Sequence, residues 1–343
     1  QALGEPRRVA MALGLELGYL TASGADGAAR ADRIAAQARA VAAGVGDAFV
    51  IGLIEACNGL SDFLIGRWGR AHAHMASGLR QMRDHGVGGR WEIDLTEIFF
   101  LANLFYQGEL KELVRWTPVF LREAEERGDV YAQQGIRSWR SNVAWLVMGK
   151  PEDARAHALA VAMERGDDDG FHLHDYYQVL SNAQIDLYVG DGDGALARVD
   201  RSWRQLEGSL LLRVQSVRVE AHFLLGRAAL ASTRPDRIAV ARRAIAGLAR
   251  ERVPWADGLR ALLTAGASLA EGQRDRAALE LVAAEERLRT AEMPLHLQVA
   301  RQCRGDLVGG ASGAPLRAEA EAWLRGQAVA DPRAFVRMLL PRP

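Results

Sequence analysis

Apolar residues recur along the chain at spacings of three and four positions, and short polar turns interrupt them. The clearest copy is residues 128–166, which read as two amphipathic helices joined by the turn Gly149-Lys150-Pro151. The predicted apolar faces carry Ile136, Trp139, Val143, Leu146 and Val147 in the first helix and Ala154, His157, Ala158, Val161 and Ala162 in the second. One such hairpin cannot bury these faces alone, so it requires similar neighbours.

The turns repeat at a nearly constant interval. Small residues mark them at Gly24, Gly66, Gly108, Gly149, Gly190, Ala231, Gly272 and Gly309. Successive turns are 42, 42, 41, 41, 41, 41 and 37 residues apart. A repeat of this length fits a two-helix solenoid unit. The pattern therefore predicts an all-α fold, a right-handed superhelical α-solenoid of about eight antiparallel helix pairs with a short C-terminal capping helix.

We expect one solenoid over residues 1–343. Its predicted repeats are residues 2–44, 46–86, 91–128, 129–166, 171–208, 209–252, 255–292 and 294–330, followed by the cap at 331–343. Pro118 predicts a kink or a break in the second helix of the third repeat.

Small residues stand at fixed distances from the turns, where two helices of a hairpin can approach closely. The best copies are Gly59/Gly66/Ala71, Asn142/Gly149/Ala154, Ala183/Gly190/Ala195 and Ala265/Gly272/Ala277. This pattern resembles the tetratricopeptide repeat (TPR) family over essentially the whole chain. The period is longer than the family's roughly 34 residues, and the sixth turn lacks glycine, so these are elongated, degenerate copies.

Composition supports a helical fold and narrows the partners. Apolar residues make up 49% of the chain, which is enough for a continuous core. The 43 basic and 43 acidic residues cancel, which argues against a broad nucleic-acid surface. Cys57 and Cys303 lie far apart within helical patterns, as buried thiols of a reducing compartment do. No apolar run reaches membrane-spanning length and no signal peptide is visible, so we expect a cytoplasmic location without membrane insertion.

A narrower resemblance covers the C-terminal two-thirds. Segments such as LFYQGELKEL, GFHLHDYYQVLSNAQIDLYVGDGDGALARV and MPLHLQVARQCRGDLVGG resemble the helical-repeat tails of large bacterial serine/threonine protein kinases, those of myxobacteria in particular. The resemblance implies a C-terminal regulatory or scaffold region of such a kinase. The chain begins at Gln1, inside an amphipathic pattern, so we expect it to be a piece of a longer polypeptide.

The sequence contains no set of residues that predicts catalysis or cofactor binding. It has no kinase catalytic loop, no Asp-Phe-Gly and no spaced nucleophile–base set, so this fragment is not expected to be an enzyme. His172 and His174 diverge on a helix, and the aspartates at 167–169 are better explained as an acidic helix start than as a cation site. The GDGDG turn at 190–194 lacks the spaced ligands of a calcium loop. We therefore expect no metal and no cofactor.

Recognition of a protein or peptide is the expected function, since the first helices of such repeats line an extended concave surface. The candidates are first-helix residues off the packing stripe: Trp91, Glu92, Arg137, Trp139, Arg140, Asn142, Tyr176, Tyr177, Gln178, Asn182, Arg218, Glu220 and His222. For Trp139 and Tyr177, a place in the core between repeats is an equally good interpretation. The partner could be the upstream kinase domain itself.

Two other functions remain open at this point. The repeats could be the effector-sensing arm of a signal-transduction ATPase or transcription regulator, or they could mediate self-association.

Overall fold

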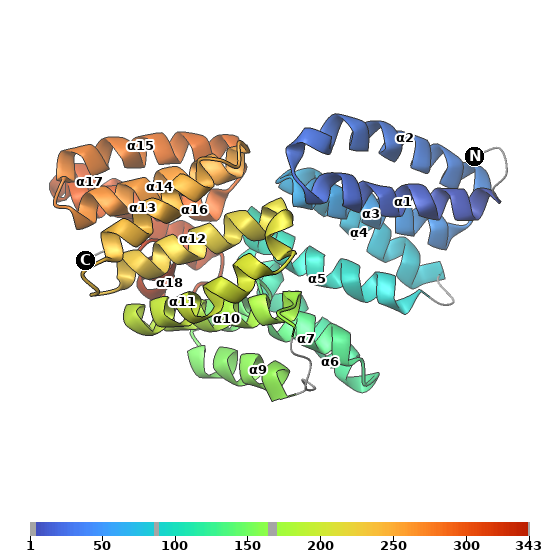
Figure 1. The fold of residues 1–343 in the computed structure, drawn as a ribbon, viewed down its shortest axis with the longest axis horizontal. Coiled ribbons are helices and arrows are strands. Elements are labelled where there is room, and N and C mark those ends of the chain that lie inside the picture. The colour runs from blue at the N-terminus through green and yellow to red at the C-terminus, as the bar shows by residue number, and fades with distance from the viewer. Residues whose placement is uncertain (1–4, 86–88, 164–169, 342–343) are drawn as a thin grey trace. The chain divides into compact units, whose positions relative to one another are not determined.

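The computed structural model describes residues 5–85, 89–163 and 170–341. These residues form eighteen α-helices and two short 3-10 helices, and none of them lies in a strand (Figure 1). Consecutive helices pack against one another as pairs. The predicted all-α fold of helix pairs is therefore confirmed.

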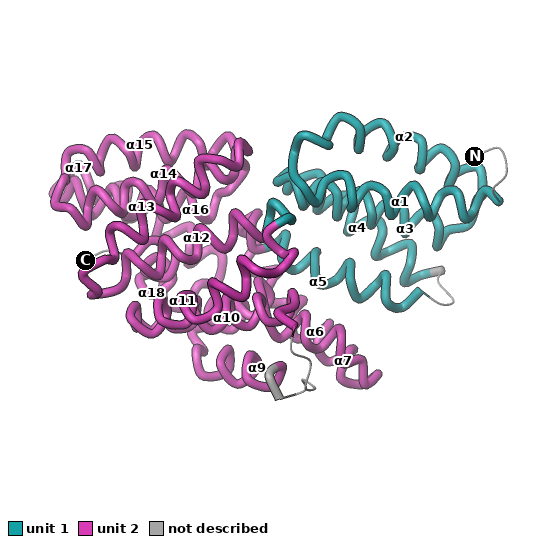
Figure 2. The backbone as a smooth tube through the Cα atoms, in the orientation of Figure 1, with its two compact units in different colours: residues 1–104, 213–216 teal, residues 105–212, 217–343 magenta. Residues whose placement is uncertain are grey.

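The chain divides into two compact units (Figure 2). Unit 1 comprises residues 1–104 and 213–216, and unit 2 comprises residues 105–212 and 217–343. The predicted boundaries of a single solenoid and its eight repeats stay a prediction.

Unit 1 is built from α1 to α4 and most of α5. The bounds of these elements are α1 Pro6–Ala22, η1 Ala25–Gly27, α2 Ala28–Val45, α3 Ala48–Leu64, α4 Trp68–His85 and α5 Arg90–Gln107. Helix α1 packs on α2 and α3, and α3 packs on α4. A Cβ placed on Gly59 of α3 would lie only 2.9 Å from the backbone nitrogen of Met75 in α4. The small residue predicted at this position is therefore required for close helix packing.

Unit 2 contains the remaining pairs, and Figure 1 shows α14 to α17 lying alongside one another. Its elements are α6 Leu110–Glu126, α7 Val130–Arg137, α8 Val143–Val147, α9 Pro151–Met163, α10 Leu173–Val189, α11 Gly192–Gly208, η2 Leu211–Arg213, α12 Gln215–Ala231, α13 Arg237–Leu248, α14 Pro254–Ala270, α15 Arg274–Thr290, α16 Pro294–Val308, α17 Gly310–Gly326 and α18 Pro332–Leu339. The last residues of α5 also belong to unit 2, whereas η2 ends and α12 begins within unit 1.

The C-terminal helix α18 does more than close the last pair. It contacts α16 and α17, as a cap does, but it also packs against α10. The guanidinium of Arg337 donates a hydrogen bond to the carbonyl of Tyr188 at 2.6 Å. The end of the chain is thus tied to a helix nearly 150 residues earlier, which the repeat pattern does not predict.

The turn glycines lie where the period predicts them. Gly66, Gly108, Gly149, Gly190 and Gly272 all have φ between 72° and 93°, the left-handed region that favours glycine. Helix α6 runs through Pro118 as one element, so the break considered there is absent.

We expect Gly59→Ala to destabilise the chain by about 1–3 kcal/mol, because the added methyl group must push α3 away from α4. The matched control is Gly44→Ala in α2, where a Cβ would meet nothing within 4 Å. That change should instead stabilise by about 0.5–1 kcal/mol, since alanine restricts the unfolded chain. Urea unfolding of both variants measures the difference, and equal midpoints would contradict the packing argument.

Candidate functional site

The first helix of the fourth repeat is broken, which corrects the continuous helix expected there. Helix α7 ends at Arg137, α8 begins at Val143, and Ser138 between them is extended. Trp139 follows with φ 53°, a conformation that costs a bulky residue roughly 1–3 kcal/mol and persists only where its surroundings fix it. The side-chain amide of Asn142 helps to fix it, since it donates to the carbonyls of Arg137 at 2.8 Å and Ala154 at 2.9 Å.

The break places Trp139 and Arg140 on a buried carboxylate, that of Glu220 in α12. Arg140 Nε donates to this carboxylate at 3.0 Å, Trp139 Nε1 donates at 3.0 Å, and the hydroxyl of Tyr106 donates as well. Arg140 Nη1 also donates to the side-chain oxygen of Gln184 in α10 at 2.7 Å. These five residues, here called the Glu220 cluster, are each at most 3% exposed. They join α10, α12, the end of α5 and the segment 138–142 of unit 2.

Rings and a second arginine surround the Glu220 cluster. Tyr177 stacks on Trp139 with ring centroids 4.7 Å apart and planes 10° from parallel. The guanidinium of Arg140 lies 4.7 Å from the centroid of the Phe105 ring. Arg227, which is fully buried, donates to the carbonyl of Met338 at 3.0 Å.

Burial sets the protonation of these groups. Desolvation alone would lower the pKa of Arg140, but the Glu220 carboxylate outweighs it and raises that pKa. Desolvation together with the charge of Arg140 lowers the pKa of Arg227 to about 9, so it remains a cation at neutral pH. Desolvation, with the charges of Arg140 and Arg227, lowers the pKa of His296 to about 3, so its imidazole is neutral there. The negative charge of Glu220 is thus balanced by Arg140, and its oxygens accept hydrogen bonds from protein groups rather than from solvent.

The structure separates the predicted binding residues into three groups. Trp139, Arg140, Asn142, Tyr176, Tyr177, Asn182 and Glu220 are buried in unit 2. Arg137, Gln178, Arg218 and His222 are partly exposed there. Among these, Arg137 pairs with Glu125 at 2.8 Å and Arg218 pairs with Glu251 at 2.8 Å. Trp91 and Glu92 lie in unit 1, where Trp91 is 54% exposed. A binding role for any of them stays a prediction.

Trp91 and Glu92 border an apolar groove of about 250 Å³ within unit 1. Its walls come mainly from α1, α3 and α5, the first helices of three successive pairs, and Met75 of α4 also lines it. The aliphatic side chain of Leu15 on α1 is 69% exposed at this groove. Leu15 is absent from the predicted binding residues, although the sequence holds a signal for it: Leu13 and Leu17 are four positions apart and share a helix face, and Leu15 is an apolar residue off that face.

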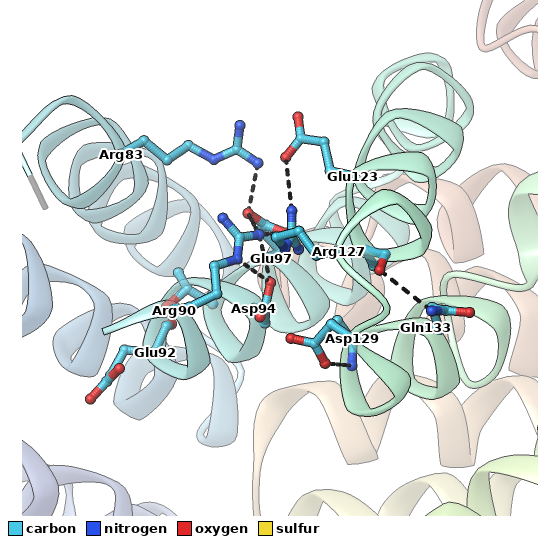
Figure 3. Close-up of polar contacts among 12 residues, drawn as sticks. Arg83, Arg90, Glu92, Asp94, Glu97, Glu123, Arg127, Asp129 and Gln133 are labelled. Carbon is cyan, nitrogen blue, oxygen red and sulfur yellow. Dashed lines mark hydrogen bonds and ion pairs between the residues drawn. The ribbon is translucent and has the colours of Figure 1, made fainter. Parts of the chain in front are cut away.

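Among the described residues that line the groove, Glu92 is the one with a charged side chain. Its carboxylate forms no ion pair with any residue in the described parts of the chain, and Figure 3 shows it directed away from its charged neighbours. Burial, with a smaller contribution from Glu92, raises the pKa of the Cys57 thiol in the groove wall to about 12. Cys57 is therefore a neutral, unreactive part of an apolar surface.

The nearby charged residues of unit 1 compensate one another. Figure 3 shows Arg83 and Arg90 on the buried carboxylates of Asp94 and Glu97, with Arg83–Glu97 at 2.6 Å and Arg90–Asp94 at 2.6 Å. In unit 2, the carboxylate of Asp129, labelled in Figure 3, caps α7 by accepting a hydrogen bond from the backbone N–H of Ala132 at 3.0 Å. These are structural contacts of buried or capping carboxylates.

The described residues contain no group of three His, Cys, Asp or Glu side chains placed to hold a metal ion. Asp175 accepts a hydrogen bond from the backbone N–H of His172 and so forms part of a capping box. In the GDGDG turn, Asp191 caps α11, and Asp193 accepts from Thr233. The aspartates at 167–169 lie outside the described residues. None of the helices that the structure describes is long and apolar enough to cross a membrane.

Comparisons with known proteins establish the fold of this chain only. No protein-family model matches the chain, and no similar curated protein is found. Among solved structures, the crystal structure of a Rap protein complexed with Competence and Sporulation Factor is similar. The two chains share 12% sequence identity with a TM-score of 0.63, over 94% of this chain and 88% of that one. This likeness confirms the TPR-like helical-repeat fold.

We expect Glu220→Gln to destabilise the chain by about 3–5 kcal/mol, because it leaves the guanidinium of Arg140 buried without a counter-charge. Glu321→Gln is the control, since its partner Arg325 is exposed, and the change should stay within about 0.5 kcal/mol. The double change Arg140→Met with Glu220→Leu should cost less than Glu220→Gln alone. Chemical denaturation of the three variants measures this, and a double variant that is the least stable would contradict it.

His296 predicts a pH dependence of stability. The folded chain keeps its imidazole neutral down to about pH 3, while the unfolded chain takes up a proton below about pH 6.5. The unfolded state therefore binds more protons in this window, and stability falls by up to about 1.4 kcal/mol per pH unit as pH drops from about 6.5 towards 3. The free energy of unfolding of His296→Phe should fall less between pH 8 and pH 4 than that of the parent chain. Parallel curves would argue against a buried neutral imidazole.

Proposed function

We propose that this chain is a non-catalytic protein-interaction module, and that the groove of unit 1 binds an apolar peptide segment carrying a lysine or arginine. The observation that carries the proposal is the exposure of Leu15 and Trp91 on either side of a groove with a single uncompensated carboxylate, Glu92. Leu15, Trp91 and Glu92 all lie on first helices of the repeats.

The groove has the chemistry of a hydrophobic anchor site. Covering exposed apolar surface is favourable by about 25 cal/mol per Å², and a Leu side chain and a Trp ring offer large areas. Buried aromatic anchors contribute most of the binding energy at protein interfaces. A segment with two or three apolar side chains would fill a groove of about 250 Å³.

The charge of Glu92 indicates that the partner also carries a basic residue. A carboxylate covered by a purely apolar ligand would lose its water without compensation, which is unfavourable. A basic side chain opposite Glu92 avoids that cost and fixes the orientation of the segment. The partner is therefore an apolar segment with one cation, rather than an acidic or purely aliphatic one.

The wider setting is also part of the proposal. The similar Rap structure is a complex of a helical-repeat protein with a bound factor, which supports recognition as the use of this fold. The resemblance of the C-terminal segments supports a regulatory or scaffold region of a bacterial serine/threonine kinase, with its kinase domain as a candidate partner. The upstream reading frame tests this part, since a kinase catalytic loop and Asp-Phe-Gly should appear there.

A random peptide library selected on the chain tests the groove. The enriched peptides should combine apolar residues with Lys or Arg, and Leu15→Glu or Trp91→Ala should weaken their binding by about ten-fold or more. Glu92→Gln should weaken the binding of peptides with a basic residue and leave the binding of matched neutral peptides unchanged.

The matched control is Leu279→Glu on α15 of unit 2, a leucine that is 73% exposed. It introduces the same charge away from the groove and should leave peptide binding unchanged. Peptides that bind Leu15→Glu and the parent chain equally well would place recognition elsewhere.

A further inference from the structure

A second, larger cavity lies wholly within unit 2. It has a volume of about 800 Å³, within the range of sites for small molecules. Helices α14 to α18 all contribute to its lining. The helices of the unit 1 groove do not contribute, so the two sites are independent.

Arginine dominates the charged lining of this cavity. Four guanidinium groups, those of Arg274, Arg317, Arg333 and Arg337, face two carboxylates. Glu321 pairs with Arg325, which is not in the lining, at 2.8 Å, and Asp306 lies 3.9 Å from Arg317, one of the four. Three arginines are left with no carboxylate partner among the described residues.

These three arginines keep their charge and most of their donors. Arg274 donates to the carbonyl of Leu307 at 3.0 Å, and Arg337 donates to the carbonyl of Tyr188 at 2.6 Å. A backbone carbonyl uses one of the five N–H donors of a guanidinium and leaves its charge in place. Arg333, which is exposed on the first turn of α18, makes no hydrogen bond or ion pair with the described residues.

We propose that this cavity binds a small organic polyanion. Its phosphate or carboxylate groups engage Arg274, Arg333 and Arg337, because the guanidinium fork matches the oxygens of both groups. Its uncharged part lies against the apolar lining, which includes Leu307 and Val336. A neutral or cationic ligand would leave the surplus positive charge of the cavity uncompensated.

Binding would act on the helix that ties the C-terminus to the middle of unit 2. Helix α18 supplies Arg333 and Arg337 to the cavity and packs against α10. The backbone carbonyl of Met338 on the same helix accepts from the buried Arg227. An anion that links α15 to α18 stabilises the folded form of unit 2, so it should raise the melting temperature.

Calorimetric titration and thermal melts of the full chain test the proposal, with pyrophosphate, ATP and citrate as probes and adenosine as the neutral control. At least one anion should bind and raise the melting temperature, and added salt should weaken that binding. Binding of pyrophosphate and ATP without citrate assigns a phosphate ligand, and the reverse assigns a polycarboxylate. Failure of all three at millimolar concentration overturns the proposal, as does equal binding of adenosine.

Arg333→Gln should lower the affinity for the anion by about ten-fold or more. Arg333→Lys should lower it by less, since lysine keeps the positive charge but loses the bidentate geometry of the guanidinium. Arg333 forms no hydrogen bond or ion pair with the described residues, so without ligand Arg333→Gln should have the melting temperature of the parent. The matched control is Arg243→Gln, an exposed arginine on α13 with the same change in net charge. If the Arg243 and Arg333 variants weaken binding equally, the anion binds through net charge and the cavity assignment is wrong. None of these outcomes depends on the unit 1 groove.

Discussion

A carboxylate that leaves water must find donors, and the carboxylate of Glu220 finds three. Its partners Tyr106, Trp139 and Arg140 come from distant segments of unit 2, so their side chains can meet only when those segments are in place. The requirement also explains the broken first helix of the fourth repeat. A continuous helix over 130–147 would carry Trp139 on its apolar stripe, whereas the left-handed φ at this residue places its indole N–H on Glu220. Local backbone strain is thus exchanged for compensation of a buried charge.

Charge compensation also distinguishes the buried side chains from the unit 1 groove and the unit 2 cavity. Several buried carboxylates are paired with arginines: Glu220 with Arg140 in unit 2, and Asp94 and Glu97 with Arg90 and Arg83 in unit 1. Surplus charge remains at the groove and at the cavity. The groove carries one carboxylate among apolar side chains, and the cavity carries an excess of guanidinium. These charges are the basis of the two proposed ligands, an apolar segment with a basic residue for the groove and a small polyanion for the cavity.

The helix-pair architecture follows from local rules, which is why the sequence predicts it well. Glycine at a turn and a small residue within a helix act through their immediate neighbours, as Gly66 and Gly59 do. Binding residues are harder to predict, because helical periodicity gives the face of a residue and says nothing of its distant neighbours. Trp139, Tyr177 and Trp91 all fall in segments predicted as first helices, yet Trp139 and Tyr177 stack in the interior while Trp91 is more than half exposed.

By itself, the sequence determined the all-α class, the period of about 41 residues and the positions of the turns, since each depends on residues close together in the chain. Only the tertiary structure decided which polar side chains are enclosed, where Leu15 is left exposed, and how α18 returns to α10. These outcomes depend on contacts between residues far apart in sequence, such as Arg337 with Tyr188. Their energies are settled by burial and charge compensation in the packed state, and no local pattern of apolar and polar residues encodes them.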